Sequence, residues 1–525
     1  MSRGASRPPK LVLAVVDAMK PAMLERAVST GRAPAMKLLM ERGVYVDDCV
    51  ASFPSVTPVC AASIATGTGP DRHGIPSMNW YHRREGRYVE YGTSFSASRT
   101  FGFKRSLTDT IYNMNSEHLS ADVATVFESL DDAEVRTAGT TYLMYRGRHR
   151  HEPAVDTALA RLATQVFRKP VLGPREFFYA DIFASRRTGC RAQLGLPGVR
   201  DQHAGCVGAH LIENDLFDFL LLSLPDNDTH SHRNGPFAQV GSIAEADRQI
   251  ERLMHAAGGP DAFLAEHAVI VCSDHSQSKV EAEIDLFATF EDFAVLPPDA
   301  SKPEDATIAL CPASRSAQVY LLDGADAALL GRVERAALET DGVDIVMRLT
   351  DHPDGEALVR TSRGELRFSP GGALRDLRGG RWSLDGDPSI LALETADGEV
   401  ASATYPDALG RIWSALRCRT AGDVLLSAAP GYEFLDWGRA HHVGGGSHGS
   451  LHANDSHGVL LWCGAGLPER DARPQWSLDD ITPMIREHFG ATGDAAGASR
   501  GAAVGAAKGA AKGGGKRRGR AKGER

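Results

Sequence analysis

Four continuous apolar runs constrain the fold of this chain more than any other feature. They are LVLAVV at 11–16, DFLLLSL at 218–224, AVIVC at 268–272 and GVLLWC at 458–463. Uninterrupted runs of Val, Ile and Leu are typical of strands that are buried on both faces, as in a parallel sheet. Helical patterns lie between the runs, at 244–258 and at 21–42, where Gly31 and Pro34 predict a break into two short helices. The alternation predicts an α/β fold with a central, mostly parallel sheet flanked by helices.

The length and local composition predict how the chain is divided. At 525 residues it exceeds the roughly 250–300 at which single cores stop growing. We expect one main domain at 1–490, in which 276–440 contains an inserted α+β cap, because pieces such as SAQVYLL and EALVRTSRGELRF alternate like hairpin strands. The tail at 491–525 is rich in Ala, Gly, Lys and Arg and is expected to be disordered.

The charge of the chain is unevenly distributed. Residues 491–525 hold nine Lys/Arg against two acids, about +7, so the net charge of −9 leaves about −16 for the rest. The tail is predicted to be solvated, and its alternative role is weak contact with a polyanion. An acidic body that handles phosphate needs local positive charge, which metal ions can supply.

The cysteines and the apolar segments bear on the compartment. The eight cysteines form no CxxC pair and do not read as a disulfide framework. The apolar run at 11–16 is shorter than the roughly 7–15 residues of a secretory signal core. No segment approaches the roughly 18 apolar residues of a membrane span. We therefore expect a cytoplasmic protein without a membrane partner.

Residues able to bind metal follow the predicted strands. Asp17 ends the first run, and Asp274 and His275 follow the third in SDHS. In open α/β sheets, ligands bind outside the carboxyl ends of the strands, so these side chains are expected to meet there. Thr57 precedes Pro58 and the helical pattern VCAASIAT, which places its hydroxyl at or near a helix N-terminus. Such a hydroxyl is either a cap or a nucleophile activated by metal, and the helix N-terminus favours an anion.

The stretch SLPDNDTHSHRNGP at 223–236 offers two overlapping pairs of metal ligands. Asp226 and His230 are four residues apart, and so are Asp228 and His232. The residues alone leave both pairs open. In GGGSHGSLHANDSHG, at 444–458, the candidate ligands are His448, His452 and His457, and the glycines allow the backbone to approach a site closely.

The ordered set Asp, Thr, Asp-x-x-x-His, Asp-His, His resembles the alkaline phosphatase superfamily, most closely its type I phosphodiesterase/nucleotide pyrophosphatase branch. FPSVTPVCAASIATGTGPDRHGI at 53–75 is similar to the segment around that branch's nucleophilic threonine, and SDH and the last His-Gly are shared too. The resemblance covers about 1–275 and 440–490. It implies an alkaline-phosphatase-like catalytic domain. The family pattern D-x-x-x-H-x-x-G favours Asp228 and His232, because Gly235 follows three residues after His232.

The resemblance implies two divalent metal ions, with Zn²⁺ expected and Mn²⁺ or Fe as alternatives. Two ligand sets follow from it: Asp17, Thr57, Asp274 and His275 for one ion, and Asp228, His232 and His448 for the other. Asp226 and His230 are then expected to orient the ligands, and His452 and His457 are alternatives to His448. Asn79 is expected to bind a phosphate oxygen, although it stands one residue later than the family's Asn.

The implied activity is hydrolysis of a phosphodiester or nucleotide through attack by Thr57 and a phospho-threonine intermediate. A phosphomonoesterase of the same superfamily is the alternative, and a polyanion-binding protein that acts through its tail is the alternative of another class. Substrate specificity is expected to come from loops within 80–215 and 276–440, and the sequence gives no indication of the oligomeric state.

Overall fold

The computed structural model describes residues 8–154, 167–301, 303–322, 326–351 and 355–492. Most of the predicted disordered tail, from residue 493 on, therefore lies outside the described residues. Within the described parts of the chain, no helix combines the length and the apolar character needed to cross a bilayer.

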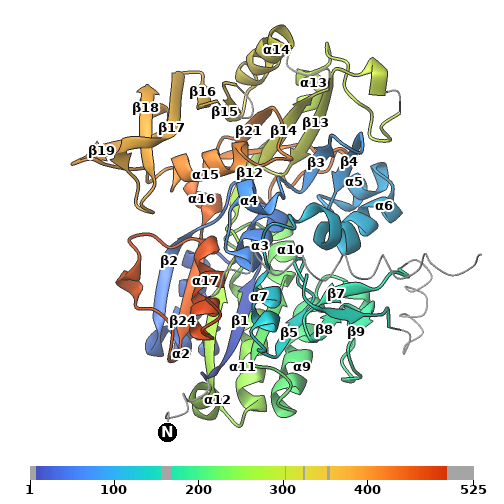
Figure 1. Cartoon of the computed structure of the whole chain (residues 1–525), viewed down its shortest axis with the longest axis vertical. Helices are drawn as coiled ribbons and strands as arrows, with labels where there is room; N and C mark the ends of the chain where they lie inside the picture. Colours follow the sequence, from blue (N-terminus) through green and yellow to red (C-terminus); the bar gives the residue numbers. More distant parts are fainter. Residues whose placement is uncertain (1–7, 155–166, 302, 323–325, 352–354, 493–525) are drawn as a thin grey trace, which may run out of the picture.

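An eight-stranded sheet forms the centre of the lower lobe in Figure 1. Its strands, in spatial order, are β2 (Val44–Val50), β24 (His457–Cys463), β11 (His267–Cys272), β1 (Lys10–Val16), β10 (Phe219–Leu224), β5 (Thr137–Thr140), β8 (Glu176–Tyr179) and β9 (Phe183–Ala184). The five strands from β11 to β8 are parallel, whereas β24 runs antiparallel to both of its neighbours and β9 to β8. The predicted central, mostly parallel sheet is confirmed, and all four apolar runs are strands in it.

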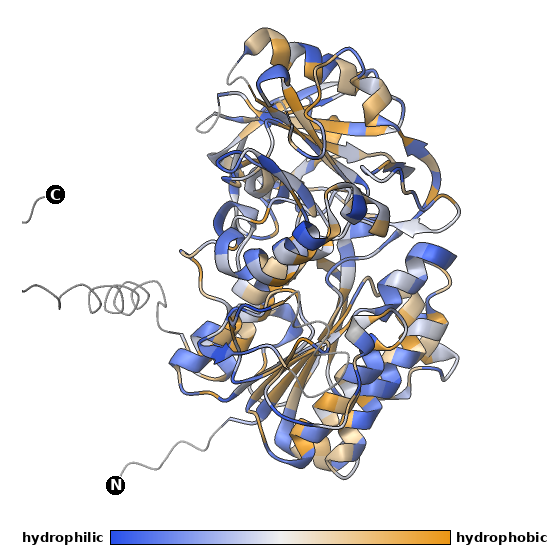
Figure 2. Ribbon diagram, turned by 90° about the vertical axis from the view of Figure 1, so that its right-hand side faces the viewer, coloured by the Kyte–Doolittle hydropathy of each residue, from blue (hydrophilic) through white to orange (hydrophobic). Residues whose placement is uncertain are grey.

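The sheet is covered on both faces, and β1 shows why its sequence is apolar throughout. Leu11, Leu13 and Val15 face one core cluster, whereas the alternate side chains of this strand face the other. The first cluster includes residues of α3 (Thr57–Thr66), α7 (Val126–Asp132) and α17 (Ile481–His488). The second includes residues of α1 (Pro21–Ser29), α2 (Pro34–Arg42), α9 (Arg200–Glu213), α11 (Val240–Ala256) and α12 (Pro260–Glu266). In Figure 2 these strands are apolar and the flanking helices carry most of the polar residues.

A second, largely antiparallel sheet forms the upper lobe in Figure 1, within the region predicted to hold a cap. It contains β13 (Ile308–Ala313), β14 (Ser316–Leu321), β21 (Val424–Ala428), β15 (Val343–Leu349), β16 (Ala357–Thr361), β17 (Gly364–Arg375), β18 (Arg381–Gly386), β19 (Glu394–Ala396) and β20 (Glu399–Ala401). Two separate apolar clusters hold α14 (Ala327–Leu338) and α15 (Ala408–Leu416) against it. The predicted hairpin-like strands are therefore present.

A small sheet and a buried ion pair connect the two lobes. In the small sheet, β12 (Ser278–Ile284) lies between β22 (Gly431–Phe434) and β23 (Gly446–Ser447). Arg315, in the β13–β14 turn, donates to Asp455 at 2.6 Å, and both side chains are fully buried. Asp455 also accepts from the backbone of Ser450, so the ion pair fixes the loop that carries His448. Removing only one partner of such a buried pair destabilises the fold, because the other charge is left buried without compensation.

One disulfide links Cys190 to Cys206, a pairing that the sequence analysis did not identify. The other six cysteines are free and buried, as expected of small core residues.

Candidate active site

The site lies where the carboxyl ends of three neighbouring strands meet. Asp17 follows β1, and Asp274 and His275 follow β11. The helix α10 (Asp226–Asn234) begins two residues after β10. Because β11, β1 and β10 are adjacent and parallel, their ends deliver these side chains to one edge of the sheet.

Thr57 and three side chains from β1 and β11 form the first group. The imidazole Nε2 of His275 lies 3.2 Å from Thr57 Oγ1, 3.6 Å from an oxygen of Asp17 and 3.5 Å from one of Asp274. Ligand atoms of Asp17, Asp274 and His275 all lie within 4.8 Å of one another. Thr57 is the first residue of α3 and caps nothing, since its hydroxyl faces His275. The structure therefore brings the four sequence-predicted residues of this set together.

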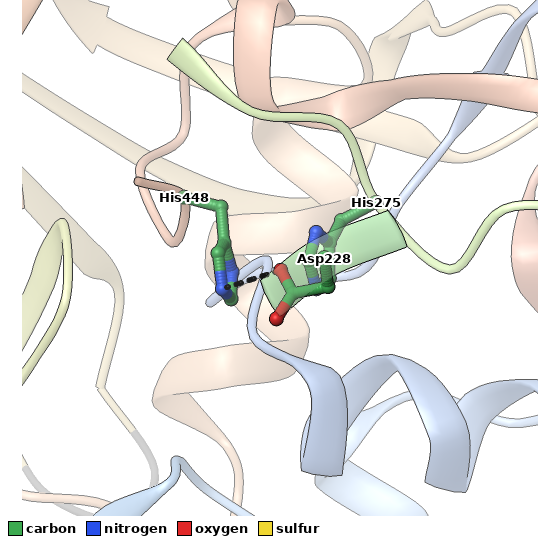
Figure 3. A group of neighbouring side chains, drawn as sticks. All are labelled: Asp228, His275 and His448. Atoms are coloured by element: carbon green, nitrogen blue, oxygen red, sulfur yellow. Dashed lines mark ion pairs between the residues drawn. The ribbon is translucent and has the colours of Figure 1, made fainter. Parts of the chain in front are cut away.

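Asp228, His232 and His448 form the second group. Asp228 Oδ1 lies 3.3 Å from Nε2 of His232 and 3.8 Å from Nε2 of His448. Figure 3 shows Asp228, His275 and His448 pointing toward one another, and the rings of the two histidines stack with centroids 3.8 Å apart. His275 thus stands between the two groups, because its ligand atom also lies within 4.8 Å of those of Asp228 and His448.

All three histidines expose the same nitrogen to the site. Their Nδ1 atoms donate to backbone carbonyls: His275 to Ser276 at 3.1 Å, His232 to Gly446 at 2.8 Å and His448 to Ser55 at 2.8 Å. Each Nε2 therefore points into the site, where it faces a carboxylate. A carbonyl that fixes the tautomer in this way is a frequent partner of metal-binding histidines.

The charges of the two ligand groups indicate that a cation would stabilise the site. Burial and the neighbouring Asp274 raise the pKa of Asp17, and burial raises that of Asp274 to about 6. Burial also lowers the pKa of His275 to about 4 and of His448 to about 3. Asp17 Oδ1 is buried without a hydrogen-bond partner. At His232, burial lowers the pKa but the Asp228 carboxylate more than offsets it, so the pKa of that imidazole is raised. Carboxylates beside His275 and His448, with an unsatisfied oxygen among them, fit divalent metal ions.

The alternative pair in α10 lies outside both groups. Asp226 accepts from Nε of Arg200 at 2.8 Å and from the backbone of Gly198 at 2.9 Å. His230 contacts the carbonyl of Ala238 at 3.1 Å. Residues two apart on a helix point in different directions, so the two pairs cannot share one site. Asp226 and His230 were expected to orient the ligands, but within the described part of the chain they form no hydrogen bond or ion pair with any of them.

The alternatives to His448 also lie elsewhere. His452 caps α16 (Ala453–Ser456) by accepting from the backbone of Asn454. His457 begins β24. Among the described residues, the two compact groups of potential metal ligands are Asp17, Asp274 and His275, and Asp228, His275 and His448, and neither includes His452 or His457. His232 is also outside these two groups, and it joins the second through its contact with Asp228.

The structure does not bring Asn79 to the site, contrary to the expectation that it binds phosphate. Asn79 begins β3 (Asn79–His82) and is buried, and its amide nitrogen donates to the carbonyl of Val89 and to the carboxylate of Glu90. Met78, one residue earlier, lines the cavity beside Thr57 instead. Successive side chains point to opposite sides of an extended chain, so the shift by one residue turned Asn79 away.

Other residues of the site escaped the sequence analysis. Gln277, two residues after His275, donates to Asp228 at 2.6 Å. Arg200 lines the same cavity as Thr57, held there by Asp226. A Cβ on Gly445 would lie 2.0 Å from the carbonyl of His232, so glycine is required for this close approach. Spacing in the sequence could have pointed to Gln277 alone.

Comparisons with known proteins place this geometry in a family. The family model described as type I phosphodiesterase / nucleotide pyrophosphatase matches residues 11–370. Comparison with curated protein sequences finds no significant match.

Solved structures share the fold at low sequence identity. Phosphonoacetate hydrolase from Sinorhizobium meliloti 1021, in complex with phosphonoformate, is 17% identical with a TM-score of 0.52, over 94% of this chain and 98% of its own. Human ectonucleotide pyrophosphatase/phosphodiesterase 5 is 13% identical with a TM-score of 0.53, over 92% and 95%. The murine form of the latter, as an inactive variant in complex with AMP, is 12% identical over the same shares, with a TM-score of 0.53.

The match to the family model spans well over half of the chain, and the fold agrees with it. The chain belongs to the type I phosphodiesterase/nucleotide pyrophosphatase family, and it is a hydrolase of phosphoric ester or phosphoanhydride bonds.

Proposed function

We propose that the chain is a phosphodiesterase that depends on two divalent metal ions and uses Thr57 as its nucleophile. One observation carries the proposal: the hydroxyl of Thr57 lies 3.2 Å from Nε2 of His275, the imidazole that stands between the two groups of potential metal ligands. A threonine at the start of a helix that caps nothing and faces a set of acids and imidazoles is suited to attack rather than to structure.

The residues present fit two metal ions. One ion would be held by Asp17, Thr57, Asp274 and His275, and the other by Asp228, His232 and His448. Mixed carboxylate and imidazole ligands suit zinc, with manganese or iron as alternatives. When bound, the two ions would supply Lewis acidity and positive charge for a displacement at phosphorus.

The chain's own residues then carry out two displacements. Thr57 Oγ1 attacks phosphorus and its proton passes to solvent, while the bond from phosphorus to the leaving oxygen breaks and that oxygen takes a proton from solvent to leave as an alcohol. Water then cleaves the phospho-threonine ester, which returns the hydroxyl and releases the phosphomonoester. The positive end of the α3 dipole, at Thr57, would favour the negative charge of a phosphoryl group bound there. Catalysis would rest on positioning and charge neutralisation, as in other phosphoryl transfers.

Family membership supports the diester as the substrate, and the phosphomonoester is the alternative within the superfamily. The cavity beside Thr57 also has room for an organic group on phosphorus. A binding function of the tail is a separate matter, because residues 493–525 lie outside the described part of the chain.

The test compares hydrolysis of bis-p-nitrophenyl phosphate and p-nitrophenyl phosphate by zinc-loaded protein, in the wild type, Thr57→Ala and Thr66→Ala. Thr66 is the matched control because it ends the same helix and its hydroxyl bonds to the carbonyl of Ala62. We expect faster cleavage of the diester, its loss in Thr57→Ala and its retention in Thr66→Ala. Faster cleavage of the monoester with the same dependence on Thr57 would assign a phosphomonoesterase. Full activity of Thr57→Ala would disprove the nucleophile.

A further inference from the structure

A large cavity opens beside the proposed nucleophile. Its volume is about 830 Å³, and Asp17, Thr57 and Asp274 form part of its wall. This volume lies within the roughly 300–1,000 Å³ of small-molecule sites. A group attached to a phosphorus atom at Thr57 would therefore extend into it.

Most of the remaining wall is apolar and comes from parts of the chain that carry no recognised motif. Leu107 belongs to α6 (Phe103–Thr108), and Ile111 to the π-helix η1 (Asp109–His118). Tyr142, which follows β5, already donates its hydroxyl to the carbonyl of Ala61. The other large apolar or aromatic side chains of the wall are Met78, Phe103, Leu143, Phe167, Tyr179, Ile182 and Leu196. The lining belongs to 15–274, with no described residue of 276–440 among it.

The polar side chains of the wall suit a phosphate better than a nucleoside. Arg200 is fixed by Asp226 through Nε at 2.8 Å and by Thr229 through Nη2 at 2.6 Å, so its positive charge stays at the wall. Lys104 adds a second, exposed cation. The neutral aliphatic hydroxyl groups of the wall are those of Thr57, Thr110, Thr141 and Ser223. Next to Leu107, Ile111 and Phe167, a base and a ribose would therefore lose most of their hydrogen bonds to water without replacement, which lowers affinity.

Two side chains of the wall also present apolar surface to solvent. Leu196 is 59% exposed and Phe103 is 50% exposed, and the ring of Phe103 lies 5.9 Å from that of Phe95, which is 75% exposed. Clustered exposed apolar side chains beside a cavity indicate a ligand that is itself partly apolar. An amphiphile would cover them as it enters.

We propose that the cavity holds the alkyl chain of an amphiphilic phosphoester, so that this enzyme acts on phosphoric esters of aliphatic chains in preference to nucleotides. The inference rests on the proposed function, since it places the phosphorus at Thr57. The apolar wall contacts the alkyl chain of the ligand. Arg200 attracts the anionic phosphate to which this alkyl chain is attached.

The test measures binding of methyl-, butyl- and octylphosphonate to the zinc-loaded full-length protein by calorimetry, with thymidine 5′-monophosphate for comparison. Burial of each methylene is expected to lower Kd about two- to fourfold, so octylphosphonate should bind at least about 100-fold more tightly than methylphosphonate. Equal Kd values along the series, or tighter binding of the nucleotide than of octylphosphonate, would overturn the inference.

Variants of the cavity wall test whether the alkyl chain of the ligand lies in the cavity. Leu196→Ser and Phe103→Ser change exposed side chains, so their folds should persist, and each should reduce the octyl-to-methyl ratio of affinities at least about fivefold. Leu172→Ser is the matched control, because Leu172 is 53% exposed and does not line the cavity. An unchanged ratio in both cavity variants would contradict the assignment. The wild-type series stands as a test even if a variant fails to fold.

A parallel assay separates this inference from the proposed function. Methyl and octyl p-nitrophenyl phosphate share one leaving group, and kcat/KM should be at least about tenfold higher for the octyl ester. If hydrolysis depends on Thr57 but not on chain length, the inference fails and the proposed function stands. If affinity depends on chain length and no ester is hydrolysed, the cavity is assigned and the proposed function fails.

Discussion

The ligand groups at the strand ends and the apolar cavity share Asp17, Thr57 and Asp274, yet they are built in opposite ways. The ligand groups come from residues at the ends of strands and from the helices α3 and α10 that start beside them, and their imidazoles are fixed by backbone carbonyls. The cavity wall is apolar, and much of it comes from short helices and loops between 95 and 200. Chemistry in this fold is thus set by the sheet, whereas selection of the organic group is left to the segments that surround it.

The two Asp-x-x-x-His pairs in α10 also differ in role, since one belongs to a ligand group and the other holds Arg200 at the cavity wall. Substituting the aspartate of each pair separately gives the largest expected effect. Asp228→Asn weakens a ligand group, so we expect loss of about one metal equivalent and a fall in kcat/KM of at least about 100-fold. Asp226→Asn frees Arg200 and should raise KM by less than about tenfold, with metal content unchanged. Elemental analysis and diester kinetics measure both. Equal metal loss in the two variants would contradict the assignment of the pairs.

Removal of the metal tests the ligand groups as a whole. Asp17 and Asp274 are buried near each other, and without a cation their repulsion destabilises the folded state. Zinc at about 100 times its Kd should stabilise the chelated protein by about 2.7 kcal/mol, which appears as a rise in Tm. His232→Ala should reduce this rise, whereas His230→Ala, its matched control on the same helix, should keep it. A Tm that does not respond to zinc would speak against any resident metal.

Met78 and Asn79, at the start of β3, allow a second comparison between the cavity and the rest of the fold, because the two neighbouring side chains face different surroundings. Met78 lines the cavity, so Met78→Ala should change KM for an octyl ester by about three- to tenfold. Asn79→Ala removes the donor to Glu90 and should lower the free energy of unfolding by about 1–3 kcal/mol while KM stays the same. Kinetics at low temperature and thermal unfolding separate the two effects. A larger change in KM for Asn79→Ala than for Met78→Ala would indicate that Asn79 does contact the substrate.

Glu90 tests a buried carboxyl group that affects stability away from the proposed metal sites. Burial raises its pKa from 4.5 to about 7, so the folded state binds the proton more tightly than the unfolded state. The stability from this group is therefore complete below about pH 4.5 and is lost as the pH rises through about 7. The difference in stability between the wild type and Glu90→Gln should shift by about 2.5 kcal/mol between pH 5 and pH 8, in favour of the variant at pH 8. Thermal unfolding at the two pH values measures it, and a constant difference would contradict the raised pKa.

Much of the fold and the positions of Asp17 and His275 could be predicted because they depend on local pattern, whereas the choice of Asp228 and His232 followed from the resemblance to the family. The apolar runs at 11–16 and 268–272 are strands, and Asp17 and His275 lie where parallel strands deliver them. Asn79 failed because a shift of one residue reverses the direction of a side chain in extended backbone. Arg200 and the cavity wall could not be foreseen, since their positions depend on how helices far apart in sequence pack together.

The most direct test of the central claim is to identify the covalent intermediate. Zinc-loaded protein is mixed with bis-p-nitrophenyl phosphate, quenched in acid within one turnover and digested for peptide mass mapping. The account predicts a p-nitrophenyl phosphoryl group on the peptide that contains Thr57, localised to its hydroxyl and absent in Thr57→Ala. The same group on another residue, such as Ser55, or a first turnover that releases p-nitrophenol without any adduct, would contradict it.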